Sequence, residues 1–157
     1  MKNIFLIIVT SLLLSSCASK ASFNSFYSEN KEDCTFSIST PAFFANLFIP
    51  KDDIEEYKDI FKKVKHYKVM VFSEGSISLD KKFDRFVKRK NYSSIFKISQ
   101  NGDKVQLYFL ESKDRIKEIL LKVKSDNEFV VLGLKTNISE SDFNKIVKKS
   151  NIKITSN

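Results

Sequence analysis

The sequence predicts an α+β domain, with a mainly antiparallel sheet of about five to six strands and about three to four helices packed on one side. Two observations carry this prediction. Short apolar runs separated by turn residues gather in the C-terminal half, as in a series of hairpins. The helical patterns lie before and after these runs, so the regular alternation of strand and helix that builds a parallel sheet is absent.

The first strand is predicted at residues 34–39, where Cys34, Phe36 and Ile38 alternate with polar residues. This alternation indicates one apolar face, on which the Cys34 thiol is expected to be buried. A nucleophilic cysteine and an intermolecular disulfide are the alternatives for Cys34.

Five further strands are expected at residues 67–72, 94–99, 104–111, 116–124 and 129–135. Asn101-Gly102 is a strong tight-hairpin signal between the second and third of these. Residues 125–127, Ser-Asp-Asn, form a second turn. The uninterrupted apolar stretch 130–132 predicts a strand that is buried on both faces.

Helices are expected at residues 42–48, 53–64 and 80–90, and a last helix begins after Ser139. Each shows apolar residues at helical spacing. The first follows Thr40-Pro41, an N-cap residue and a proline suited to the first turn. Ser139 and Asp142 resemble a capping box at the start of the last helix.

The N-terminus has the pattern of a secretory signal. Lys2 supplies positive charge, and residues 4–14 form an apolar run interrupted only by a threonine and a serine. As a helix this run would measure roughly 16 Å, too short for the ~30 Å hydrocarbon core of a bilayer. Leu14-Ser15-Ser16-Cys17 then resembles the lipobox of bacterial lipoprotein precursors, whose cysteine accepts diacylglycerol.

These features predict three segments: a signal peptide at 1–16, a lipidated Cys17 with a flexible tether through residue 33, and a single α+β domain at 34–157. Two or more acyl chains hold a protein durably on a membrane. No acidic residue follows Cys17 through Ala21, which favours the periplasmic side of the outer membrane. The membrane is therefore the first expected partner.

The chain is basic. Residues 1–16 contain one lysine and no acid, so their removal changes the net charge only from +8 to +7. Export argues against nucleic acid as a partner and leaves anionic lipid, lipopolysaccharide phosphate or an acidic protein. A lysine-rich surface that only keeps the protein soluble is the simpler interpretation.

No residue set indicates a catalytic or metal site, and no cofactor is expected. His66 is the single histidine, zinc-binding spacings are absent, and there is no G-x-S-x-G. Stretches similar to the S-x-x-K, S-D-N and K-T-G motifs of serine β-lactamases begin at Ser78, Ser125 and Lys135. The last two lie only about ten residues apart, and Asn137 replaces the motif's glycine, so we attribute the match to coincidence.

Two surfaces remain as binding candidates. The predicted helix at 80–90 has a basic outer face, made of Lys81, Lys82, Arg85, Lys88 and Arg89. The predicted helix at 42–48 carries a candidate apolar contact surface, made of Phe43, Phe44, Leu47 and Phe48. Exposure to solvent is the simpler role for the first set, and core packing for the second.

The order of elements is familiar. A lipobox is followed by FSISTPAFF at residues 36–44, a strand, a basic helix and a hairpin, then EILLKV at 118–123, a turn, an apolar strand and a closing helix. This order resembles the small lipoproteins of Bacteroidota-type bacteria grouped as domain of unknown function 4252. The resemblance implies location and fold, and it supplies no activity and no site residues because that family is uncharacterised.

We therefore expect a non-enzymatic envelope lipoprotein that binds another protein, as an accessory or stress-response module. The alternative is a carrier or sensor of an apolar or anionic, lipid-like small ligand, held between the sheet and the Phe-rich helix. An envelope hydrolase is a remote alternative. The sequence leaves the oligomeric state open.

Overall fold

The computed structural model describes residues 22–45, 61–73, 77–100, 102–126 and 128–149. Its strands are β1 (Phe36–Pro41), β2 (His66–Phe72), β3 (Ser93–Gln100), β4 (Asp103–Glu111), β5 (Arg115–Lys124) and β6 (Phe129–Ser139). Its helices are α2 (Phe23–Asn30), the 3-10 helix η1 (Lys31–Asp33), α3 (Ala42–Ala45), α5 (Ile77–Arg89) and α6 (Glu140–Lys149).

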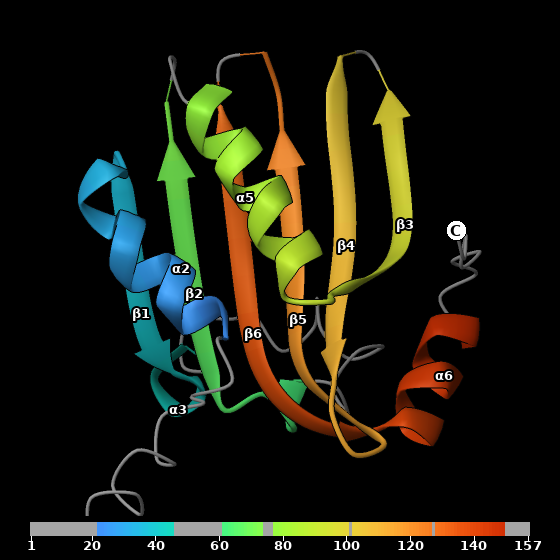
Figure 1. Cartoon of the computed structure of the whole chain (residues 1–157). Coiled ribbons are helices and arrows are strands. Elements are labelled where there is room, and N and C mark those ends of the chain that lie inside the picture. The colour runs from blue at the N-terminus through green and yellow to red at the C-terminus, as the bar shows by residue number, and fades with distance from the viewer. Residues whose placement is uncertain (1–21, 46–60, 74–76, 101, 127, 150–157) are drawn as a thin grey trace, which may run out of the picture.

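The six strands form one antiparallel sheet in the order β1-β2-β6-β5-β4-β3. Helices α2 and α5 lie across the same face of this sheet, whereas α6 lies at one end of it (Figure 1). The predicted α+β class with a mainly antiparallel sheet is confirmed. One detail differs from the prediction, which placed all helices on one side of the sheet. Helix α6 packs its Phe143 against Phe109, whose side chain points to the face opposite α5.

The predicted turns and the last helix start are present. Gly102 has a φ of +92° in the β3–β4 hairpin, a backbone conformation that favours glycine. The β5–β6 turn is closed by the Ser125 N–H, which donates to the Glu128 carbonyl at 2.9 Å. At the start of α6 the Asp142 N–H donates to Ser139 Oγ at 3.2 Å, as the capping pattern predicts.

The prediction of a flexible tether is wrong for residues 22–33, because α2 and η1 belong to the folded domain. Phe23 and Phe26 are 3% and 2% exposed, and Tyr27 is also buried. These aromatic residues are spaced i, i+3, i+4, so one face of a short helix carries them all. Ser22 Oγ caps that helix by accepting from the Asn24 N–H at 3.3 Å. The tether residues before Ser22 lie outside the described residues.

The main core lies between the sheet and the two helices on its face. The Phe26 ring meets Phe83 edge-on at 5.4 Å between centroids and lies 5.1 Å from Phe86. Phe83 in turn contacts Tyr108 and Phe129 from the sheet. Because α2 and α5 share this aromatic cluster, residues N-terminal to the predicted domain help to complete its core.

The predicted apolar face of the first strand does not point into the core. Phe36 and Ile38 are 54% and 43% exposed. They point to the face opposite α2, because their neighbour Ser37 lies opposite Met70 of the core. Cys34 precedes the strand and is half-buried, with its Sγ donating to the Asn30 carbonyl at 3.4 Å.

Two other predictions are only partly met. In the stretch 130–132, Val131 is fully buried but Val130 and Leu132 are half-exposed, because described helices cover mainly one face of β6. The helix predicted at 42–48 is present over α3, and its remainder lies outside the described residues. Most of the helix predicted at 53–64 also lies outside them.

We predict that Phe26→Ala lowers the free energy of unfolding by about 3 kcal/mol or more, because removing a buried phenyl ring leaves a cavity among three aromatic residues. Urea denaturation of the full-length chain in detergent micelles measures this. The control is Phe43→Ala, since Phe43 is 69% exposed. Equal midpoints for the two variants would mean that α2 is a tether after all.

Candidate functional site

The sheet face opposite α2 and α5 carries three rows of side chains that each cross all six strands. The first row is Phe36, Val71, Val130, Val123, Val105 and Ile98. The second row is Ile38, Val69, Leu132, Leu121, Leu107 and Phe96. The third row is Thr40, Tyr67, Leu134, Ile119, Phe109 and Ser93. The third row includes the polar residues Thr40, Tyr67 and Ser93, whereas the first two rows contain none. We call the first two rows the apolar rows.

Described elements cover this face at one end only. In the third row, Ile119 and Phe109 pack with α6, while Tyr67 packs with Ala42 and Val64. No residue of the first row belongs to the three core clusters that the described residues form. The two ends of that row, Phe36 and Ile98, are 54% and 53% exposed. In the second row, Phe96 and Leu107 pack against the cluster that includes α6, and Leu132 packs against the cluster of Tyr67. The first row is therefore the part of this hydrocarbon surface for which the described residues supply little cover.

The helix-covered face is more polar, although it is better buried. Lys122 is 3% exposed and forms ion pairs with Asp80 and Asp84 of α5. Burial by itself would raise the pKa of Asp80, but hydrogen bonds from Lys122 and Lys124 hold that pKa below its usual value. These lysines thus fasten α5 to the sheet through charge as well as through its phenylalanines.

A cavity of about 310 Å³ lies on this same face, between the start of α2 and strands β2, β6 and β5. Its polar lining includes His66, Lys68, Lys135 and Glu118. His66, Lys135 and Glu118 are direct cross-strand neighbours in one row. Gly133 lies beside Lys68 on the next strand and leaves room for the Phe23 ring, which would clash with any side chain there.

The Glu118 carboxylate holds one wall of the cavity together. It is 7% exposed, and its Oε2 accepts a hydrogen bond from the Phe23 N–H at 2.8 Å and another from the Tyr92 hydroxyl. Burial, followed by the charge of Glu118, raises the pKa of Tyr92 far above its usual value. A carboxylate bound in this way fixes the first turn of α2 against β5.

The basic groups share a second hydrogen-bond network. Lys68 Nζ donates to Ser39 Oγ at 2.7 Å and lies 4.3 Å from the centroid of the Tyr27 ring. Ser39 Oγ is also 2.8 Å from His66 Nε2. Burial lowers the pKa of Lys68, although the charge of Glu118 raises it and repulsion from Lys135 lowers it again. Burial, then repulsion from Lys68 and Lys135, lowers the pKa of His66.

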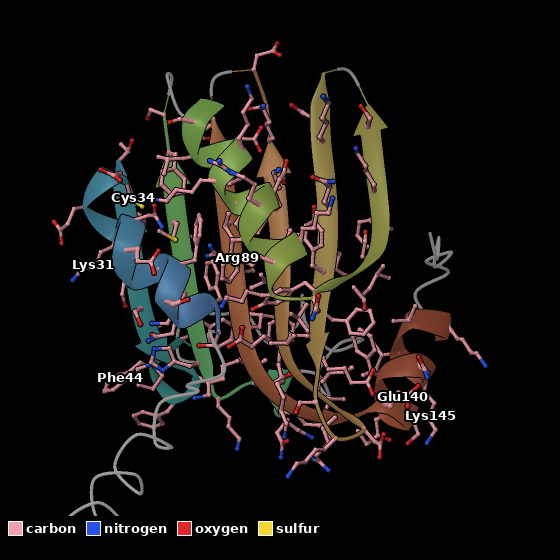
Figure 2. The ribbon with its side chains drawn as sticks, viewed as in Figure 1. Lys31, Cys34, Phe44, Arg89, Glu140 and Lys145 are labelled. Carbon is pink, nitrogen blue, oxygen red and sulfur yellow. The ribbon has the colours of Figure 1, made fainter. Side chains whose placement is uncertain are left out.

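The structure does not bring the two predicted surfaces together. All five residues of the predicted basic face are exposed on α5, and Phe44 lies on α3, away from Arg89 on α5 (Figure 2). Phe43 and Phe44 are 69% and 54% exposed, so core packing is not their role in the described structure. Leu47 and Phe48 lie outside the described residues.

Sequence reasoning missed the cavity residues. Glu118 could have been noticed, because it shares the inward-facing parity of Ile116 and Leu120 in an otherwise apolar strand pattern. Lys68 and Lys135 gave no signal, since lysines are frequent throughout this chain. Their proximity depends on the pairing of β2 with β6, which the sequence did not reveal.

Two further features carry no site. Carboxylate oxygens of Glu111, Asp114 and Glu140 lie within 4.8 Å of one another, but all three residues are exposed to solvent. Among the residues described here, no helix is long and apolar enough to cross a membrane.

The family comparison bears on nearly the whole described chain. The model of the family described as Domain of unknown function (DUF4252) matches residues 27–146. The chain is a member of the DUF4252 family. The match begins inside α2, in agreement with the place of that helix in the folded DUF4252 domain. No curated protein and no solved structure matches this chain.

We predict that Cys34 reacts slowly with a disulfide reagent. Burial, and then the charge of Asp33, raise the pKa of this thiol to about 11, so at pH 8 it holds roughly a hundredth of the thiolate of an ordinary cysteine. The reaction is followed by absorbance in a Cys17→Ser variant, where Cys34 is the single thiol, and it should accelerate in urea. A native rate equal to the urea rate would instead support a reactive cysteine.

Proposed function

We propose that this DUF4252 protein is a lipid-anchored envelope protein that acts as a non-enzymatic accessory module and docks a partner protein on its apolar rows. The anchor rests on the signal and lipobox pattern that ends at Cys17. We place the anchor in the outer membrane, facing the periplasm. The docking role rests on the apolar rows, the single observation that carries this proposal.

The apolar rows are suited to protein contact because they are continuous and are exposed at their ends, where Phe36, Ile38 and Ile98 lie, while their other side chains are half-buried. Twelve side chains in two rows include no polar or charged group. Burying one such side chain fully contributes about 1.5–3 kcal/mol. Large exposed apolar patches on soluble domains commonly mark sites of interaction.

The expected occupant is an amphipathic helix of the partner. On the same face α6 already packs Phe143 against Phe109, so a helical layer has begun next to the apolar rows. Helices pack with axes about 8–10 Å apart, which sets the thickness of that layer. A partner helix would continue this layer beside α6.

The proposal is tested with Phe36→Glu/Ile98→Glu, a change at two exposed positions of the first row. Native protein is crosslinked in intact cells and purified, and the attached proteins are identified by mass spectrometry. With the unaltered chain, we expect to recover one envelope protein in an amount near that of the chain itself. With the variant, this protein should be lost, because the new charges would be buried unpaired in an apolar contact.

Two controls make the result specific. Lys97→Glu changes the net charge by the same total of two units, and Lys97 lies next to Ile98 on the same strand but on the opposite face. Phe43→Ser/Phe44→Ser removes two exposed phenylalanines that lie outside the apolar rows. Both should retain the partner. Loss of the partner only with the Phe43/Phe44 variant would move the contact to α3, and recovery of no protein with any chain would contradict the proposal.

A further inference from the structure

We propose that the cavity beneath the start of α2 is a binding site for a phosphate ester, in which Lys68, Lys135 and His66 contact the phosphate group. This inference concerns the face opposite the apolar rows and stands or falls independently of the docking proposal.

The first step is the surplus of positive charge in the cavity. Lys68 and Lys135 line it with one carboxylate, Glu118. That carboxylate is already bound by the Phe23 N–H and the Tyr92 hydroxyl. Burial and the neighbouring Lys135 both oppose the charge on Lys68, while Glu118 favours it. An anion in the cavity removes both penalties.

The second step is the supply of hydrogen-bond donors. Lys68 Nζ donates to Ser39 Oγ, so the Ser39 hydroxyl is free to donate its own proton to His66 Nε2, 2.8 Å away. This arrangement leaves the proton of a neutral imidazole on Nδ1, from which it can donate to a ligand. Lys135, directly across the strand pair from His66, adds an exposed ammonium group. Several donors with two positive charges suit the oxygens of a phosphate.

The third step is the apolar part of the lining. The side chains of Phe23 and Leu120 border the same cavity. A volume of about 310 Å³ exceeds what a bare phosphate ion needs and leaves space for the carbon skeleton of a small ester. The first N–H of α2 is used by Glu118, so the ligand is held by side chains and the helix end is not the site.

Two sources could supply this chemistry, a soluble phosphate ester or the head group of a phospholipid. Ser22 at the cavity lies five residues after Cys17. Five residues span at most about 18 Å when fully extended. If Cys17 carries lipid, head groups therefore lie within reach of the cavity.

The test uses the one histidine of the chain as a reporter. Glycerol 3-phosphate is titrated into the full-length protein in neutral detergent micelles, while NMR follows the imidazole signals of His66. We expect saturable chemical-shift changes with the unaltered protein. In Lys68→Gln/Lys135→Gln the affinity for glycerol 3-phosphate should fall at least about tenfold, because charge-assisted hydrogen bonds are lost. If the double variant unfolds, Lys135→Gln alone, at an exposed position, should still weaken binding severalfold.

The matched control is Lys81→Gln/Lys82→Gln, which removes the same charge from the exposed face of α5 and should leave the affinity unchanged. Vesicles of phosphatidylglycerol and of phosphatidylcholine then distinguish the sources. Shifts with glycerol 3-phosphate alone identify a soluble ester, and shifts with phosphatidylglycerol identify a head group. Absence of saturable shifts with every probe, or equal weakening in the control, overturns the proposal.

Discussion

The two faces of the sheet are unequal, and the rest of the structure depends on this inequality. Alternation along each strand sends every second side chain to one face. Antiparallel pairing then lines up these side chains into rows that contain only aliphatic and aromatic residues from β1 to β3. The opposite face holds the lysines and Glu118, yet it receives α2 and α5 (Figure 1). The more polar face is thus the better covered one among the described elements.

Specific polar contacts explain how that face can be buried. Lys122 is paired with two aspartates of α5, and Glu118 accepts from α2 and Tyr92. Buried charges are tolerated when they are paired and hydrogen-bonded, and they fix the position of the partner that supplies the bonds. An apolar face has no such charged pairs to fix the position of an element that packs on it. It can therefore receive an element from outside the domain without a loss of internal pairing.

Much of the fold could be predicted from the sequence, because strand alternation, Asn101-Gly102 and the Ser139 cap are local signals. The helix α2 was missed since its polar residues outweighed three aromatic residues at helical spacing. Alternation also tells which residues share a face but not which face receives a helix, so Phe36 and Ile38 were assigned to the core. The cavity could not be predicted, because its lining comes from α2, β2, β5 and β6, and their adjacency depends on strand order.

On the proposed function, another protein covers the apolar rows in the cell. The most direct measurement places a photoreactive amino acid at Ile98 and, in a separate strain, at the neighbouring Lys97, which points to the other face. After illumination of intact cells, we expect a crosslinked partner protein from position 98 and none from position 97. Equal crosslinking from both positions, or crosslinks from position 98 only to the same chain, would contradict it.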